Sequence, residues 1–190
     1  MCRKGYEILV KNGYWAVRKG ERGFNSLSPE EGFDPGQWYN LKCYGIMDPG
    51  VDTDVRNGWV DSSIKDHVWL IEMWHNVVPE DDGYYQTILV DEAMQHLEYI
   101  KQQSDSNSIW VATITEAVKY FREKQNSNVT AYIIDNELHI MVELTDKNMS
   151  YDVFDQPLTV NVNMPSGENQ IFDVVPGRET VVDLEAINYG

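Results

Sequence analysis

The sequence predicts an α/β protein in which parallel βα units are followed by a small antiparallel all-β module. In the first two thirds, apolar segments of strand length alternate with segments of helical periodicity, which is the order of parallel βα units. In the last third, short segments of alternating polarity are separated by turn-forming residues. The polar stretch 125–128 contains poor helix formers and places the boundary between domains 1–127 and 128–190.

The first domain is expected to begin with a helix over 3–11, which ends at the helix stop Asn12-Gly13. Strands are expected at 14–18, 41–46, 68–74 and 109–113, and the third is apolar enough to be buried on both faces. Helices are expected over 90–103, on the spacing of apolar residues, and from Thr115 onward, with Thr115 as the N-cap.

The second domain is expected to hold five strands, with the sequences VTAYII, LHIMVEL, PLTVNVNM, IFDVV and ETVVDL. The turn signals between them are Asp135-Asn136, Pro165-Ser166-Gly167 and Pro176-Gly177. This domain carries eleven acidic residues against Lys147 and Arg178.

Length and charge exclude several classes of protein. The chain has 190 residues, whereas a complete eight-fold barrel needs about 250. The net charge of −16 repels phosphate backbones and anionic lipid heads, so we expect neither nucleic acid nor a membrane surface as a partner. No segment has the apolar run of a signal peptide or a membrane span. Cys2 and Cys43 lie far apart and are interpreted as unpaired thiols.

One strand end is the best candidate for chemistry. His75 follows the apolar segment 69–74, and the carboxyl ends of parallel strands are where such folds carry functional groups. Imidazole transfers protons near neutral pH, so His75 is a candidate general acid or base, with equal weight on a purely structural role. Trp74 beside it could stack on a sugar ring. His67 lies at the opposite end of the same segment and is not expected to share a site with His75, and His96 and His139 are expected to be structural.

Other reaction types lack a motif. A catalytic metal needs about three protein ligands, and no His-x-x-x-His pair occurs. Asp52-Thr53-Asp54 begins like a calcium loop but lacks the glycine and glutamate of that motif, so it is interpreted as a solvated acidic loop. There is no phosphate-binding glycine loop and no G-x-S-x-G motif.

Most of the chain resembles the carboxyl-terminal half of polysaccharide deacetylases, in particular those with a β-rich tail. The residues that carry the resemblance are, in order, GYWAVR, Asn25-Ser26-Leu27, WLIEMWHNV, Gly83-Tyr84, VDEAMQHLEYIKQQ, IWVATITEAVKYFREKQ and Pro157-Leu158-Thr159. The resemblance implies a partial (β/α) barrel ahead of the β module. It also implies an N-acetylated glycan as ligand, and a cell-envelope or extracellular location.

That family removes acetyl groups with a divalent metal such as zinc, held by one aspartate and two histidines. The motifs that supply these ligands have no counterpart here, so we expect no metal in this chain and no deacetylase activity from it alone. The family's late motif maps onto 70–75, and His75 inherits the role of general acid by resemblance. Arg18 lies near the family's arginine region and is a candidate for substrate binding.

Two other functions remain open. The first is a non-catalytic carbohydrate-binding or assembly module that presents Trp74, Tyr84 and acidic loops to a glycan. The second is self-association, because half a barrel would leave an unpaired edge strand.

Overall fold

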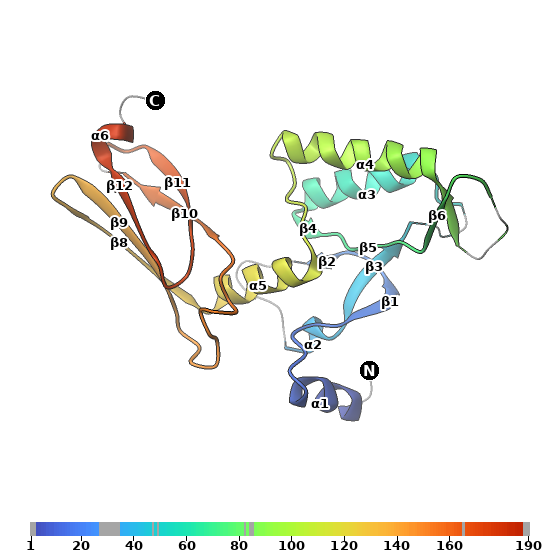
Figure 1. Cartoon of the computed structure of the whole chain (residues 1–190), viewed down its shortest axis with the longest axis horizontal. Helices are drawn as coiled ribbons and strands as arrows, with labels where there is room; N and C mark the ends of the chain where they lie inside the picture. Colours follow the sequence, from blue (N-terminus) through green and yellow to red (C-terminus); the bar gives the residue numbers. More distant parts are fainter. Residues whose placement is uncertain are drawn as a thin grey trace. The chain divides into compact units, whose positions relative to one another are not determined.

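The computed structural model describes residues 3–26, 35–46, 48, 50–81, 83, 86–164 and 166–187. The chain forms two compact units, residues 1–111 and 112–190, and each is described by itself (Figure 1). The helix that precedes the sequence-based boundary at 127/128 lies in the second unit.

The first unit combines short parallel strands with helices. Its elements are α1 (Arg3–Lys11), β1 (Arg18–Arg22), β2 (Asn25–Ser26), α2 (Pro35–Trp38), β3 (Leu41–Gly45), α3 (Thr53–Asp66), β4 (Val68–Trp69), β5 (Glu72–Met73), β6 (Asn76–Val78), β7 (Thr87–Leu89) and α4 (Val90–Asp105). Strands β1, β3 and β5 form a parallel sheet in that order, β6 and β7 form a parallel pair, and β2 and β4 an antiparallel pair. The α/β class with parallel strands is therefore confirmed. The described strands do not close into a barrel.

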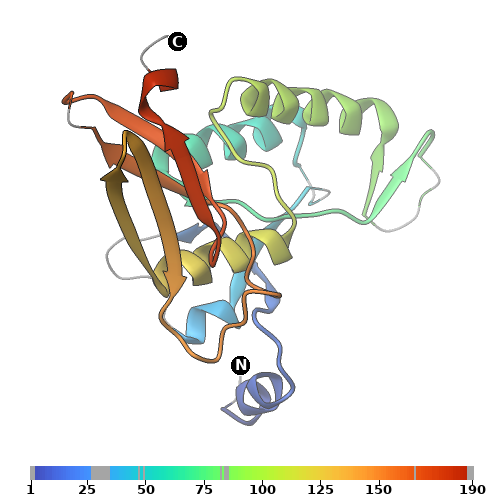
Figure 2. The ribbon, with the colours of Figure 1, turned by 60° about the vertical axis from the view of Figure 1, so that its left-hand side comes forward.

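Helices α3 and α4 lie side by side and cover one face of the β3–β5 sheet (Figures 1 and 2). Trp59 from α3 and Ala93 from α4 pack there with Ile46, and partly buried neighbours include Tyr44 and Trp74. Leu41, Cys43 and Ile71 form a separate cluster with Met73. Because strand residues alternate between faces, these two clusters mark the two sides of the sheet.

Several predicted elements of the first unit are wrong in detail. The strand expected at 14–18 is β1, which begins at Arg18. The strand expected at 68–74 is divided into β4 and β5, because each piece pairs with a different neighbour. Residues 109–113 are not a strand, because they form no backbone hydrogen-bond ladder with a described strand. Trp110 and Val111 are 52% and 59% exposed.

Two helix starts also differ from expectation. Helix α3 differs from the sequence-based expectation of a solvated acidic loop at 52–54. In the structure Asp52 is its N-cap and accepts a hydrogen bond from the Val55 N–H at 2.9 Å. Helix α5 (Ile114–Gln125) begins before the predicted cap, because Thr113 and Glu116 form a capping box.

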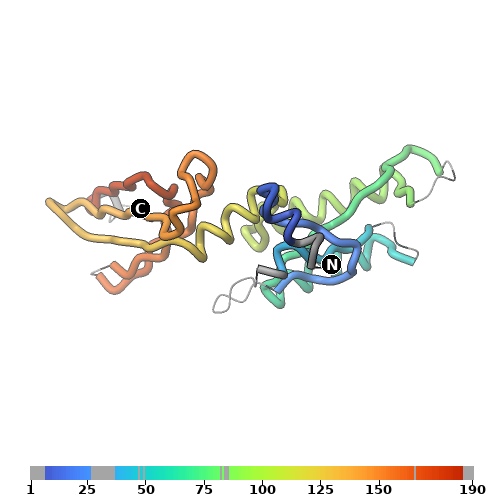
Figure 3. The backbone as a smooth tube through the Cα atoms, turned by 90° about the horizontal axis from the view of Figure 1, so that it is seen from below, coloured from blue at the N-terminus to red at the C-terminus, as the bar shows by residue number. Residues whose placement is uncertain are grey.

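In the second unit all five predicted strands are confirmed. They are β8 (Ser127–Ile134), β9 (Glu137–Leu144), β10 (Leu158–Asn163), β11 (Asn169–Val174) and β12 (Glu179–Asp183), followed by α6 (Leu184–Ile187). Two antiparallel sheets, β12-β9-β8 and β10-β11, supply an aliphatic core. The backbone that forms these strands runs from yellow to red in Figure 3. The core consists of Leu138, Ile140, Val142, Leu158, Val160 and Val174.

Two turns of the second unit depend on unusual backbone conformations. Asp135 and Asn136, with φ of 49° and 68°, form the tight turn between β8 and β9, as the sequence predicts. Gly177 has φ +74°, and a Cβ atom there would lie 2.6 Å from the ring of Tyr151. Glycine is therefore required at 177 by both conformation and space.

Candidate functional site at the carboxyl end of the parallel sheet

The carboxyl ends of β1, β3 and β5 meet at one edge of the parallel sheet. Register pairs Tyr44 with Glu72 and Gly45 with Met73, so β3 and β5 end side by side. His75 follows two residues after Met73 and is exposed. Parallel sheets carry their functional groups at this edge, and the role of His75 there stays a prediction.

Arg18 reaches the end of β5 across the sheet. Its guanidinium Nη1 lies 3.0 Å from the sulfur of Met73 and 3.4 Å from Sγ of Cys43. Met73 and Cys43 belong to the cluster on the side away from α3 and α4. The structure thus brings Arg18 to the side of the sheet that carries Met73, two residues before His75.

Trp74 lies on the opposite side. Its indole packs with the cluster under α3 and α4, and its ring is stacked on His96 with centroids 6.1 Å apart. The indole Nε1–H donates to Glu72 Oε2 at 3.2 Å. The predicted sugar-stacking role of Trp74 remains a prediction, and the half-buried indole also has a structural role. Tyr84, the other predicted aromatic contact, lies outside the described residues.

A buried polar network supports the end of β5. His96 is fully buried, with Nε2 2.8 Å from Glu72 Oε1 and Nδ1 2.8 Å from Asn57 Oδ1. Both oxygens of Glu72 are therefore engaged, one by His96 and one by Trp74. The structural role expected for His96 is confirmed.

Sequence reasoning missed a charged pair at the ends of β1 and β3. Arg22 Nη1 lies 3.4 Å from Asp48 Oδ2, and its guanidinium stands 5.1 Å from the ring centre of Tyr44. Asp48 occupies the space of a side chain at Gly45, where a Cβ would lie 2.5 Å from Oδ1. The available signal was Gly45 at a strand end followed three residues later by an aspartate.

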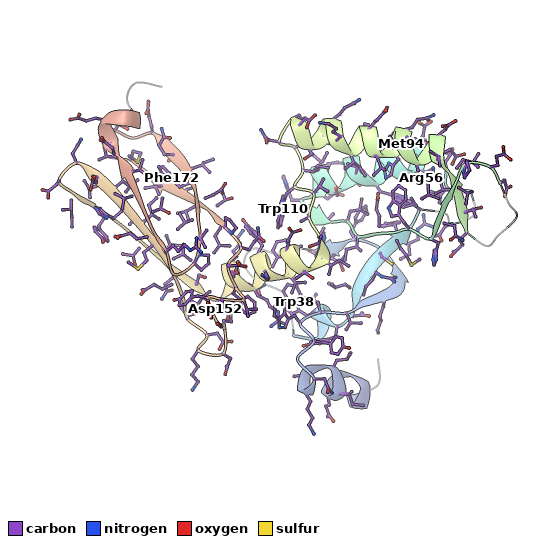
Figure 4. All side chains as sticks on the ribbon, in the orientation of Figure 1. Trp38, Arg56, Met94, Trp110, Asp152 and Phe172 are labelled. Atoms are coloured by element: carbon purple, nitrogen blue, oxygen red, sulfur yellow. The ribbon has the colours of Figure 1, made fainter. Side chains whose placement is uncertain are left out.

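Arg56 fixes the connection that carries Asp48. It is 3% exposed and lies beneath α4 (Figure 4). Its Nε donates to the carbonyl of Ile46 at 2.8 Å and its Nη2 to the carbonyl of Val51 at 2.9 Å. Its Nη1 lies 3.2 Å from Glu92. Both ends of the β3–α3 connection are thereby tied to one helix side chain.

Within the described part of the chain, no group of three or more His, Cys, Asp or Glu side chains is placed to hold a metal ion. Among the described helices, none is both long and apolar enough to cross a bilayer.

Comparison with protein-family models gives no match, and comparisons with curated proteins and with solved structures likewise give none.

Proposed function

We propose that the first unit is part of a (β/α) barrel of the polysaccharide deacetylase type and that the protein binds N-acetylated glycans through Arg18 and His75. The observation that carries the proposal is the contact of Arg18 with Met73, two residues before His75, on the side of the sheet away from α3 and α4. In a (β/α) barrel the helices cover the outer face, so this side would be the interior.

The chemistry of these groups suits an N-acetyl sugar. A guanidinium donates hydrogen bonds to a carbonyl or hydroxyl oxygen, and an imidazole can accept from the amide N–H or donate a proton to it. The described residues do not provide the metal site that the resembled family uses, and we therefore assign Arg18 and His75 to ligand binding. Hydrolysis of the amide is the activity to test.

Binding to N-acetylglucosamine oligomers, measured by isothermal titration calorimetry, tests the proposal. We expect the wild-type chain to bind and H75Q and R18Q each to weaken binding by about tenfold, the loss of roughly one hydrogen bond to a charged or polar partner. The matched control is H67N, because His67 is the C-cap of α3, just before β4, and has φ 51°, which asparagine tolerates.

The same oligomers, incubated with and without added Zn²⁺, report acetate release. If the wild type releases acetate and H75Q does not, His75 also takes part in catalysis. The proposal is contradicted if the wild type does not bind the oligomers, or if H75Q and R18Q bind as tightly as H67N.

A second candidate function, self-association, is favoured by the edge strand β8. It pairs only with β9 among the described strands, and its eight residues, SNVTAYII, include no charge, proline or glycine. The apolar side chains of Val129, Ile133 and Ile134 are exposed. The opposite edge, β12, carries Glu179 and Asp183, which discourage pairing.

Light scattering tests this second candidate. A dimer is expected for the wild type and a monomer for I133K, while I171K, which places the same charge on the exposed face of β11, should leave the dimer intact. A monomeric wild type would contradict it.

A further inference from the structure

Helix α5 holds the long connection between β9 and β10 at two successive residues. Glu123, in the last turn of the helix, accepts a hydrogen bond from the backbone N–H of Gln156 through Oε1 at 3.0 Å. One turn earlier, Lys119 Nζ lies 2.7 Å from Asp155 Oδ1. The connection, residues 145–157, is thereby fastened to the helix (Figure 4, where Asp152 marks it).

The carboxyl group of Glu123 is incompletely satisfied. Its side chain is fully buried, and Oε2 has no hydrogen-bond donor among the described residues. A carboxylate at this position would leave a charged oxygen away from water without a donor, whereas a carboxylic acid would leave only a neutral hydroxyl. The site therefore favours the protonated side chain.

The charges that face Glu123 do not reverse this preference. Lys119 on the same helix is attractive but is already paired with Asp155, and Asp155 on the connection is repulsive. Strand β10, which packs against α5, contains no ionisable side chain. Burial, with a smaller contribution from Asp155, raises the pKa of Glu123 to about 7, against the opposing effects of the Gln156 N–H and Lys119.

We propose that Glu123 is a proton-operated latch, which holds residues 145–157 on α5 when protonated and releases them when it ionises. Release would expose Phe154, which is 6% exposed in the closed form, two residues before the latched amide. The latch is a property of the second unit and does not depend on the glycan-binding proposal.

The direction of the pH dependence follows from the two pKa values. The closed form holds its proton up to about pH 7, whereas an open, hydrated glutamate loses it near 4.3. The latch is thus fully favoured below about pH 4.3, and its opening constant rises about tenfold per pH unit between roughly pH 5 and 7. Above pH 7 both forms are ionised and the opening constant levels off.

Native-state amide hydrogen exchange of the full chain, corrected for intrinsic rates, tests the proposal. In the wild type, protection of the amides at 152–156 should fall at least tenfold from pH 5.5 to 7.5. It should be independent of pH in E123Q, which retains an acceptor for the Gln156 N–H but cannot ionise. The control E143Q, which removes an exposed glutamate on β9, should behave like the wild type.

Three results would overturn the latch. One is an equal pH dependence in E123Q and wild type. Another comes from the wild type alone and so applies even if E123Q does not fold: a titration of the Glu123 side-chain carboxyl carbon, followed by NMR, with a midpoint near 4.3 rather than near 7. A titration near 7 without any change in protection at 152–156 would also refute the proposed release.

Discussion

The core between the two sheets of the second unit consists of aliphatic side chains from β9, β10 and β11, whereas the interior of the first unit includes a buried arginine and a buried histidine. Aliphatic burial is non-directional and scales with area. Buried polar groups need partners in defined positions. The first unit should therefore be sensitive to the identity of single polar residues, and the second to the volume of its core.

Tryptophan placement makes this comparison measurable, because all six tryptophans lie at or before residue 110. Tryptophan fluorescence reports the first unit, and circular dichroism of the strands reports mainly the second.

The largest expected effect is on the core of the second unit. I140A should lower the free energy of unfolding by about 3 to 4 kcal/mol, because the side chain is fully buried and leaves a cavity. Urea unfolding followed by circular dichroism measures it. I171A, at a position 68% exposed, is the control and should cost less than about 0.5 kcal/mol. Equal losses would show that Ile140 is not part of the core.

In the first unit, the replacement R56M should cost about 3 kcal/mol. Methionine fills part of the space, but the carbonyls of Ile46 and Val51 lose their donors. The tryptophan fluorescence midpoint in urea measures the loss. R22M, at a half-exposed ion pair, should cost less than about 1 kcal/mol. If the two variants are equally stable, Arg56 does not organise the β3–α3 connection.

A smaller effect is expected for the buried hydrogen-bond network in which His96 contacts Glu72 of β5. H96L should cost about 2 kcal/mol, because Glu72 would keep only its bond to Trp74. H96Q restores a donor and should recover part of this loss, as seen in the same fluorescence midpoint. A leucine variant as stable as the glutamine variant would mean that volume, not hydrogen bonding, is required at 96.

The smallest effect concerns the start of α5. T113A should lower stability by about 1 kcal/mol through loss of the capping box. T115A, at the position that the sequence pattern favoured as the cap, should change it by only a few tenths. Thermal unfolding followed by circular dichroism separates the two. A larger loss in T115A would move the helix start back to the predicted position.

The same contrast explains what could be predicted from sequence. In the second unit, alternation and turn residues agree, so all five strands were found. In the first unit, the start of α3 contains Asp52 and Asp54, and its buried positions include Arg56. An arginine that is buried because two carbonyls accept from it has no signature in a pattern of apolar residues.

The site was predicted in part for a similar reason. Position along the chain indicates that His75 follows a strand, and the structure adds that Arg18 reaches Met73. Asp48 was missed because its placement depends on a tertiary contact with Gly45. The division of 68–74 into two strands could not be predicted either, since it follows from the choice of partners, β2 and β3.

The absence of a side chain at Gly177 has a consequence for natural variation. Tyr151 lies over this glycine and accepts a hydrogen bond from the Leu144 N–H, so it fixes the connection 145–157 at a second point. In homologous sequences we expect glycine at 177 to co-vary with tyrosine at 151. A lineage that replaced the glycine would have to abandon the tyrosine as well, and its connection would then be attached through the α5 contacts of Glu123 and Lys119.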